Sequence, residues 1–128
     1  MNVETIPVII AAFSLIFAVV SFLFERKQTK SYETLNRVES LMEQYYEKLR
    51  NKGVNDHYAD YVKYLGELDR FARGVNEGVY SKRIVKRHAS IFLKMQYESF
   101  AKKLIADRRK QFGRESYYEN IEQLIKEL

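Results

Sequence analysis

The feature that most constrains this chain is an apolar run at residues 6–24. The segment IPVIIAAFSLIFAVVSFLF holds nineteen consecutive uncharged residues, and Glu25-Arg26-Lys27 follows it directly. A helix of this length extends about 28 Å at about 1.5 Å per residue, close to the thickness of one bilayer core. The run lacks the positive charge before it and the small-residue cleavage site after it that a signal peptide needs, and it lacks the polar stripe of a soluble core helix. We therefore predict an uncleaved transmembrane helix.

Charge predicts the orientation of this helix. All 22 Lys and Arg residues follow residue 25. Positively charged flanks stay on the cytoplasmic side, so we expect the N-terminus outside and the C-terminal part in the cytoplasm. The chain contains no Cys, which agrees with a reducing compartment.

The rest of the chain has the composition of a small all-α domain. Helix-forming residues dominate, and the only proline is Pro7. We predict one transmembrane helix, a stalk helix that continues it, and a small helical bundle. The expected divisions are an anchor at 1–27, a stalk at 28–53 and a cytoplasmic helical domain at 54–128.

The stalk carries an apolar seam. Nothing between Phe24 and Asn51 breaks a helix. Apolar residues recur there at spacings of three and four, as at the a and d positions of a coiled coil. The seam consists of Leu35, Val38, Met42, Tyr45 and Leu49. Two readings stay open: packing against the chain's own domain, which we favour slightly, and self-association between subunits.

Local signals predict the ends of the later helices. Expected boundaries are a start at Asn55 or Asp56, an end at Gly74, an N-cap at Ser81, a separation at Gly113 and a capping box at Ser116 and Glu119. The segment between Lys82 and Phe112 has an apolar stripe that swings around the helix near residues 96–99. Because no Gly or Pro marks a break, we expect one long helix whose halves face different neighbours. Its first half would bury one apolar side, made of Ile84, Val85, His88, Ile91, Phe92 and Met95.

A basic block lies within the same segment. Residues 82–114 hold eleven Lys or Arg against two acids, whereas residues 25–81 balance at ten of each. The candidate contacts for an anionic partner are Lys82, Arg83, Lys86, Arg87, Arg108, Arg109 and Lys110. Three readings fit this excess: a solvated face near anionic lipids, a binding surface for nucleic acid or a nucleotide messenger, or a contact with an acidic protein segment.

Chemistry-bearing motifs are scarce. The two histidines, His57 and His88, lie far apart in the chain and have no Cys to join them in a metal site. The sequence shows neither a phosphate-binding glycine loop nor a nucleophile turn. We therefore expect no enzyme activity, no metal and no cofactor.

The apolar run itself offers a contact face. Small residues recur at spacings of three and four, which places Ala11, Ser14, Ala18 and Ser21 on one side of the helix. Small residues let membrane helices approach closely, so this face predicts helix contacts in a homo-oligomer. A single helix cannot form a pore, and membrane activity would therefore require such assembly.

Three short stretches carry a resemblance to a known family. They are Leu68–Tyr80 (LDRFARGVNEGVY), Ile105–Arg109 (IADRR) and Tyr117–Asn120 (YYEN). Over residues 58–125 they resemble a bacterial family of small, N-terminally membrane-anchored proteins of unknown function. The resemblance implies no activity, but it implies a bacterial inner membrane and a chromosomal or prophage setting.

In that setting, small single-pass proteins often act as membrane-disrupting effectors against phage. The sequence-based hypothesis is thus a self-associating sensor and effector, a candidate pore-forming protein in phage defence. A cytoplasmic protein of phage origin would trigger it through the helical domain. Two alternatives remain: a tethered module that binds nucleic acid or a nucleotide, and a structural subunit of a larger membrane complex.

Overall fold

The computed structural model describes residues 3–128, and these residues form helices with no strand. The elements are α1 (Thr5–Gln44), the π-helical turn η1 (Tyr45–Leu49), α2 (Tyr58–Asn76), α3 (Lys82–His88), α4 (Ser90–Gln96), the π-helical turn η2 (Tyr97–Ala101), α5 (Lys102–Phe112) and α6 (Glu119–Glu127). The prediction of an all-helical chain with one long apolar N-terminal helix is confirmed.

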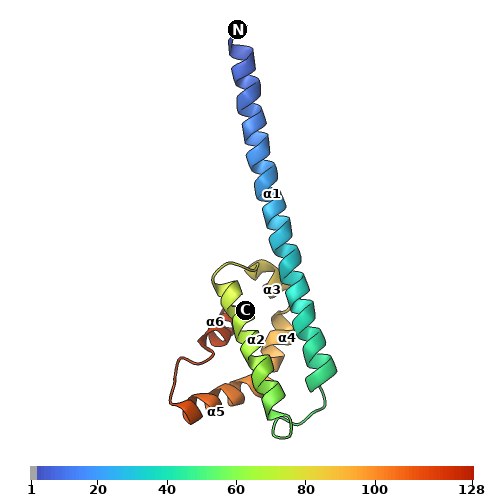
Figure 1. The fold of residues 1–128 in the computed structure, drawn as a ribbon, viewed down its shortest axis with the longest axis vertical. Coiled ribbons are helices and arrows are strands. Elements are labelled where there is room, and N and C mark those ends of the chain that lie inside the picture. Colours follow the sequence, from blue (N-terminus) through green and yellow to red (C-terminus); the bar gives the residue numbers. More distant parts are fainter. Residues whose placement is uncertain (1–2) are drawn as a thin grey trace.

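Helix α1 runs without a break from the apolar run into the bundle (Figure 1). Its first half projects away from the other helices, and its apolar side chains are exposed. It is long and apolar enough to cross a membrane, and none of its most apolar stretch is buried within the chain. The second half packs on the bundle through Thr34, Val38 and Leu41, which are buried. One helix thus serves both as the candidate membrane span and as a wall of the bundle.

The helix that forms the stalk ends at Leu49, and a loop follows it. Asn51 adopts a left-handed conformation with φ 66°, which Asn tolerates better than most residues. The hydroxyl of Tyr61 donates to the carbonyl oxygens of Leu49 (3.0 Å) and Lys52 (2.7 Å). The two oxygens share the single hydroxyl proton: Leu49 is the last residue of η1, and Lys52 lies in the loop that follows. The Tyr61 contacts stabilise the loop in which the chain turns back from α1 to α2.

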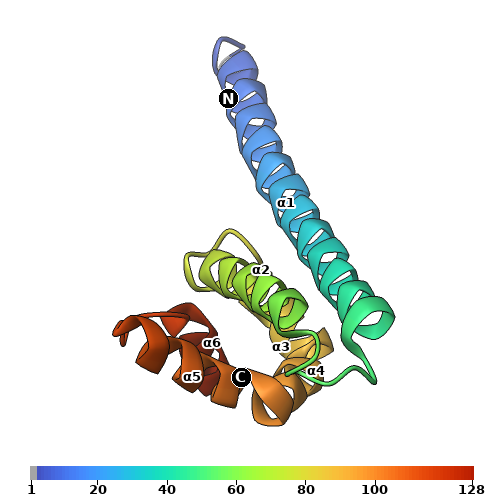
Figure 2. The ribbon, with the colours of Figure 1, turned by 60° about the horizontal axis from the view of Figure 1, so that its bottom comes forward.

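Helix α2 is the centre of the bundle. Figure 2 shows α1 on one side of α2, with α5 and α6 on the other. The buried residues of α2 are Tyr61, Tyr64, Leu65, Leu68, Phe71, Ala72, Gly74 and Val75. Helix α6 packs on α2, and α3 packs on both α1 and α2. The core therefore forms around one helix that has neighbours on several sides.

The segment 82–112 is not one helix, contrary to the sequence-based expectation. Ala89 has φ −125° and ψ 0°, and it separates α3 from α4. Farther on, the π-helical turn η2 lies where the apolar stripe swings. A π-helical turn adds a residue to the turn and so rotates the faces that follow it. The swing was predicted at the right place, but its cause is a π-helical turn and not a change of neighbour along a straight helix.

The break at Ala89 also changes which side chains are buried. His88 ends α3 and is exposed, although its spacing predicts an apolar environment. Ile91 is 84 % exposed and Met95 is 51 % exposed, so the prediction that they are buried is wrong. Ile84, Val85 and Phe92 are buried as predicted. Restarting the helix after Ala89 shifts its phase, and α4 buries Leu93 and Gln96 in place of Ile91 and Met95.

Several predicted boundaries change for local reasons. Helix α2 starts at Tyr58, after His57, and neither Asn55 nor Asp56 caps it. It passes through Gly74, where the close approach of Tyr80 requires a residue without a side chain.

Two of the three boundaries predicted for α3, α5 and α6 agree with the structure. The Ser81 cap is confirmed, because its hydroxyl accepts the Ile84 N–H at 3.3 Å. Gly113 ends α5 in a left-handed conformation, as expected. The capping box is wrong: α6 starts at Glu119 after a left-handed Tyr118, and no side chain caps it.

Candidate functional site

The basic block of the sequence is split between two ends of the bundle. Figure 1 shows α3 at the end nearest the apolar half of α1 and α5 at the opposite end. The break at Ala89 and the π-helical turn η2 turn the chain between them. The seven cations predicted as one binding surface are therefore not brought together.

Helix α3 presents most of the free charge among these seven residues. Arg83, Lys86 and Arg87 are exposed, on the side of α3 opposite its buried residues Ile84 and Val85. None of the three has an ion-pair partner within residues 3–128. Lys82, by contrast, forms an ion pair with Glu127 near the C-terminus. The accessible cationic face consists of three side chains on two turns of helix, and we name it the α3 basic face.

Hydrogen bonds hold α3 against α1. The Ser81 N–H donates to Thr34 Oγ1 at 2.8 Å, and the Thr34 hydroxyl donates to the Lys30 carbonyl oxygen at 2.7 Å. Thr34 is fully buried. A buried backbone N–H needs such a partner, because leaving it unpaired costs free energy. The chain therefore fixes the start of α3 beside the part of α1 that follows the apolar run.

A groove lies between α1 and α3. Its volume is about 720 Å³, and its lining residues are Phe24, Lys27, Gln28, Thr29, Ser31, Tyr32, Leu35 and Arg83. Two of these side chains are cationic and none is acidic. We name it the α1–α3 groove. It begins at the end of the apolar run and reaches the α3 basic face.

A second groove lies beside the loop between α2 and α3. Its volume is about 1010 Å³, and it lies between residues 22–33 of α1 and residues 77–79. Three cations and three acids line it, so it has no net charge of either sign. Val79 in this loop is 57 % exposed.

The cations of α5 mostly hold the fold together. Arg109 forms an ion pair with Glu122 and donates from Nε to the Tyr117 carbonyl oxygen at 2.8 Å. The guanidinium of Arg108 lies 4.6 Å from the centre of the Phe112 ring, a cation–π contact. Lys110 is exposed. Of the three predicted contacts on α5, only Lys110 is clear of intramolecular contacts.

Comparison with known proteins gives one match. A family described as a domain of unknown function (DUF4760) covers residues 8–128. The chain belongs to this family. No curated protein and no solved structure matches the chain. The DUF4760 match includes most of the apolar run together with the whole bundle, so the two parts form one family unit.

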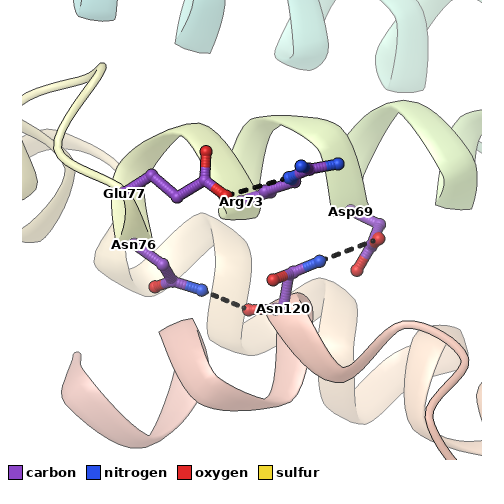
Figure 3. Close-up of polar contacts among 5 residues, drawn as sticks. All are labelled: Asp69, Arg73, Asn76, Glu77 and Asn120. Carbon is purple, nitrogen blue, oxygen red and sulfur yellow. Dashed lines mark hydrogen bonds and ion pairs between the residues drawn. The ribbon is translucent and has the colours of Figure 1, made fainter.

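The short stretches behind the sequence resemblance meet in the structure of this DUF4760 chain. Figure 3 shows how α2 and α6 are joined by polar contacts. Asn76 Nδ2 donates to the Asn120 carbonyl oxygen at 3.1 Å, and Asn120 Nδ2 donates to Asp69 Oδ2 at 3.3 Å. Arg73 and Glu77 pair on the exposed side of α2 at 3.0 Å. The two contacts of Asn120 hold α6 on α2, so the stretches at 68–80 and 117–120 are structural elements of the fold.

The other predicted positions are distributed along α1. Ala11, Ser14 and Ala18 are exposed on the apolar half, and Ser21 is half-buried. In the stalk seam, Val38 and Leu49 are buried in the core of the same chain, and Met42 and Tyr45 pack against it. Leu35 lines the α1–α3 groove. Four of the five seam residues thus pack on the bundle of their own chain.

The described residues offer little to reaction chemistry. Within residues 3–128, no group of three or more His, Cys, Asp and Glu side chains is placed to hold a metal ion. His57 Nδ1 lies 3.9 Å from Asp60 Oδ2 on the surface. The fully buried Gln96 accepts a hydrogen bond from the Tyr64 hydroxyl at 2.8 Å. Sequence reasoning missed this polar pair, since its partners are 32 residues apart.

Proposed function

We propose that this protein is a single-pass membrane sensor and effector that works by self-association. Its N-terminus lies outside a bacterial inner membrane, and its helical bundle lies in the cytoplasm, where a second protein triggers assembly. The positive-inside distribution of all 22 Lys and Arg supports this orientation. The bacterial and phage-defence setting comes from the family resemblance.

The observation that carries the proposal is the continuity of α1. The candidate span and the wall of the bundle belong to one unbroken helix of 40 residues. Thr34, Val38 and Leu41 lock the bundle to this helix. A rotation or clustering of bundles is therefore passed directly to the spans, because no flexible linker separates the two.

The apolar half of α1 supplies a contact face for assembly. Ala11, Ser14 and Ala18 are exposed on one side of the helix, and the bundle does not cover them. Small residues allow two membrane helices to pack closely, and a pore or a membrane lesion needs several helices. The proposed effector step is thus the association of spans through this face.

Expression of the full chain in bacteria, followed with a membrane-impermeant dye, tests this function. We expect dye entry when the full chain is expressed and the cells are infected with phage, which would supply the trigger protein. Dye entry should be lost when Ala18→Leu blocks the small-residue face. Ala12→Leu is the matched control, because Ala12 lies on the other side of the helix. Ser14→Cys provides a second readout in this cysteine-free chain, since close spans would form a disulfide-linked dimer. Intact membranes in every condition, with no cross-linked dimer, would refute the proposal.

A second candidate function rests on the α3 basic face. Arg83, Lys86 and Arg87 are exposed and unpaired within residues 3–128, so they are available to a nucleic acid or a nucleotide messenger. A tethered binding module would show binding that weakens steeply with salt and with Arg83→Ala and Arg87→Ala. Stable co-purification of another membrane protein would favour a structural subunit of a larger complex.

A further inference from the structure

We propose that the α1–α3 groove binds the phosphate headgroup of an anionic phospholipid, in the leaflet where the span ends. The bundle would then have a second membrane contact beside its anchor. This inference requires that α1 crosses a membrane. It does not require self-association or a trigger, and it therefore stands or falls separately from the effector step.

The position of the groove is the first argument. It begins at Phe24, the last residue of the apolar run, and extends along α1 to Leu35. Phe24 and Thr34 are ten residues apart, or about 15 Å along a helix. The headgroup zone occupies roughly 5–8 Å on each side of a bilayer core. The membrane end of the groove therefore lies at headgroup level, and α3 lies within about one further Debye length.

The chemistry of the groove is the second argument. Lys27 and Arg83 line it, and no acidic residue does. Ser31 adds a hydroxyl donor, and Phe24 adds an apolar wall at the end that meets the membrane. Two cations and a hydroxyl match a phosphate group, and an apolar wall matches the start of an acyl chain. The neighbouring groove beside Val79 has balanced charge and lacks this preference.

An aromatic residue marks the same level. Tyr32 is 68 % exposed and lines the α1–α3 groove. Tyr is enriched at the boundary between membrane and water, where its ring and its hydroxyl meet different environments. Tyr32 follows Phe24 by eight residues, or about 12 Å of helix. Because helical side chains point back toward the N-terminus, its ring can reach the headgroup zone from there.

The arrangement is fixed before any lipid binds. The Ser81–Thr34 hydrogen bond and the Lys82–Glu127 ion pair hold α3 in place, which keeps Arg83 on the same groove as Lys27. Lys86 and Arg87 extend the positive charge along α3. A site held by the fold loses little freedom on binding, so a weak headgroup contact can still orient the bundle.

A fluorescent reporter tests this contact in the full chain. The sequence contains no Trp, so Val79→Trp places a single Trp in the exposed loop next to α3. The protein is reconstituted in phosphatidylcholine vesicles with and without phosphatidylglycerol, and a nitroxide-headgroup lipid serves as the quencher. We expect stronger quenching in the anionic vesicles, and weaker quenching as salt is added. Gln111→Trp on α5 is the control reporter and should stay unquenched.

Charge variants assign the contact to the groove. Each cation near an anionic leaflet favours docking by roughly five-fold. The double variant Lys27→Gln with Arg83→Gln should therefore lower the ratio of docked to undocked protein by on the order of 25-fold. The matched control, Lys102→Gln with Lys110→Gln, removes equal charge from α5 and should change little. Arg83→Gln alone is included because Lys27 also flanks the span and helps to set its topology.

Three outcomes would overturn the proposal. The first is equal quenching in neutral and anionic vesicles. The second is an equal loss of quenching in the α5 control variant. The third is loss of quenching in anionic vesicles when an oligonucleotide is added that binds only if Arg83 is present, which would assign the face to nucleic acid.

Discussion

The backbone N–H of Ser81 donates a hydrogen bond to Thr34 Oγ1 across 47 positions of the chain, at 2.8 Å. This bond joins the start of α3 to the buried side of α1. Thr34 in turn bonds back to Lys30 within its own helix. This threonine thereby helps to place the basic helix relative to the candidate membrane span, together with the buried Ile84 and Val85 and the Lys82–Glu127 ion pair.

Replacing this threonine should loosen α3. Thr34→Val keeps the shape but leaves the Ser81 N–H without its acceptor, and an unpaired buried donor costs about 1–3 kcal/mol. Thr34→Ser retains the hydroxyl and is the matched control. Thermal unfolding of the full chain in detergent micelles, followed by circular dichroism, measures the difference. Equal melting temperatures for the Val and Ser variants would show that the bond contributes nothing.

The buried Tyr64–Gln96 pair predicts a dependence of stability on alkaline pH. Burial raises the pKa of the Tyr64 hydroxyl above its ordinary value of 10.0. Above about pH 10 the unfolded chain releases this proton while the folded chain keeps it, so the free energy of unfolding falls as pH rises. The contribution of one such group is at most about 1.4 kcal/mol per pH unit.

Tyr64→Phe isolates this contribution. At neutral pH the variant should be less stable by about 1–3 kcal/mol, because Gln96 loses its donor in the core. The difference in the free energy of unfolding between the two proteins should narrow above about pH 10, because only the unsubstituted protein has the Tyr64 hydroxyl proton to lose. Urea titrations across that range measure it. A gap that stays constant with pH would contradict the assignment. Burial also raises the pKa of Tyr61, so a smaller slope should remain in the variant.

Two glycines of α2 should respond in opposite directions to alanine. At Gly74 an added Cβ would lie 2.6 Å from Tyr80 Cδ2, whose ring packs on Phe71 at 5.3 Å between centroids. Gly74→Ala must displace this ring, and overpacking of this kind costs about 1–3 kcal/mol. At Gly66 a Cβ would meet nothing within 4 Å, so Gly66→Ala should raise stability by about 0.5–1 kcal/mol. Melting temperatures that fall alike in both variants would be inconsistent with the packing at Tyr80.

Replacing Arg109 should lower the stability of the fold more than replacing its exposed neighbour Lys110. Arg109→Met removes the ion pair with Glu122 and the bond to the Tyr117 carbonyl oxygen, at an expected cost of about 2 kcal/mol. Lys110→Met on the exposed side should change stability by less than about 0.5 kcal/mol. Chemical unfolding of both variants measures the contrast. An unchanged unfolding midpoint for Arg109→Met would show that the contacts of Arg109 do not stabilise the fold, and its charge would then be available to a partner.

Local signals in the sequence predicted much of the fold. The apolar run, the unbroken helix from Phe24 into the stalk and the Ser81 cap each depend on neighbours within a few residues. The swing of the apolar stripe near residues 96–99 was also visible. Its cause was not, because a π-helical turn at Tyr97–Ala101 leaves no Gly or Pro to mark it. The break at Ala89 was missed for the same reason, and His88 and Ile91 were misplaced with it.

The sequence by itself determined that this chain is helical, that one helix can cross a membrane and that most of its excess positive charge follows residue 81. Only the tertiary structure decided which of those charges are free. Lys82 is paired by Glu127, 45 positions later, and Arg109 is paired by Glu122 after a left-handed turn. Arg83 has no ion-pair partner within residues 3–128, and it lines the same groove as Lys27 on a helix that Thr34 helps to hold. Periodicity is a local property, whereas ion pairs and grooves depend on which distant segments the folded chain brings together.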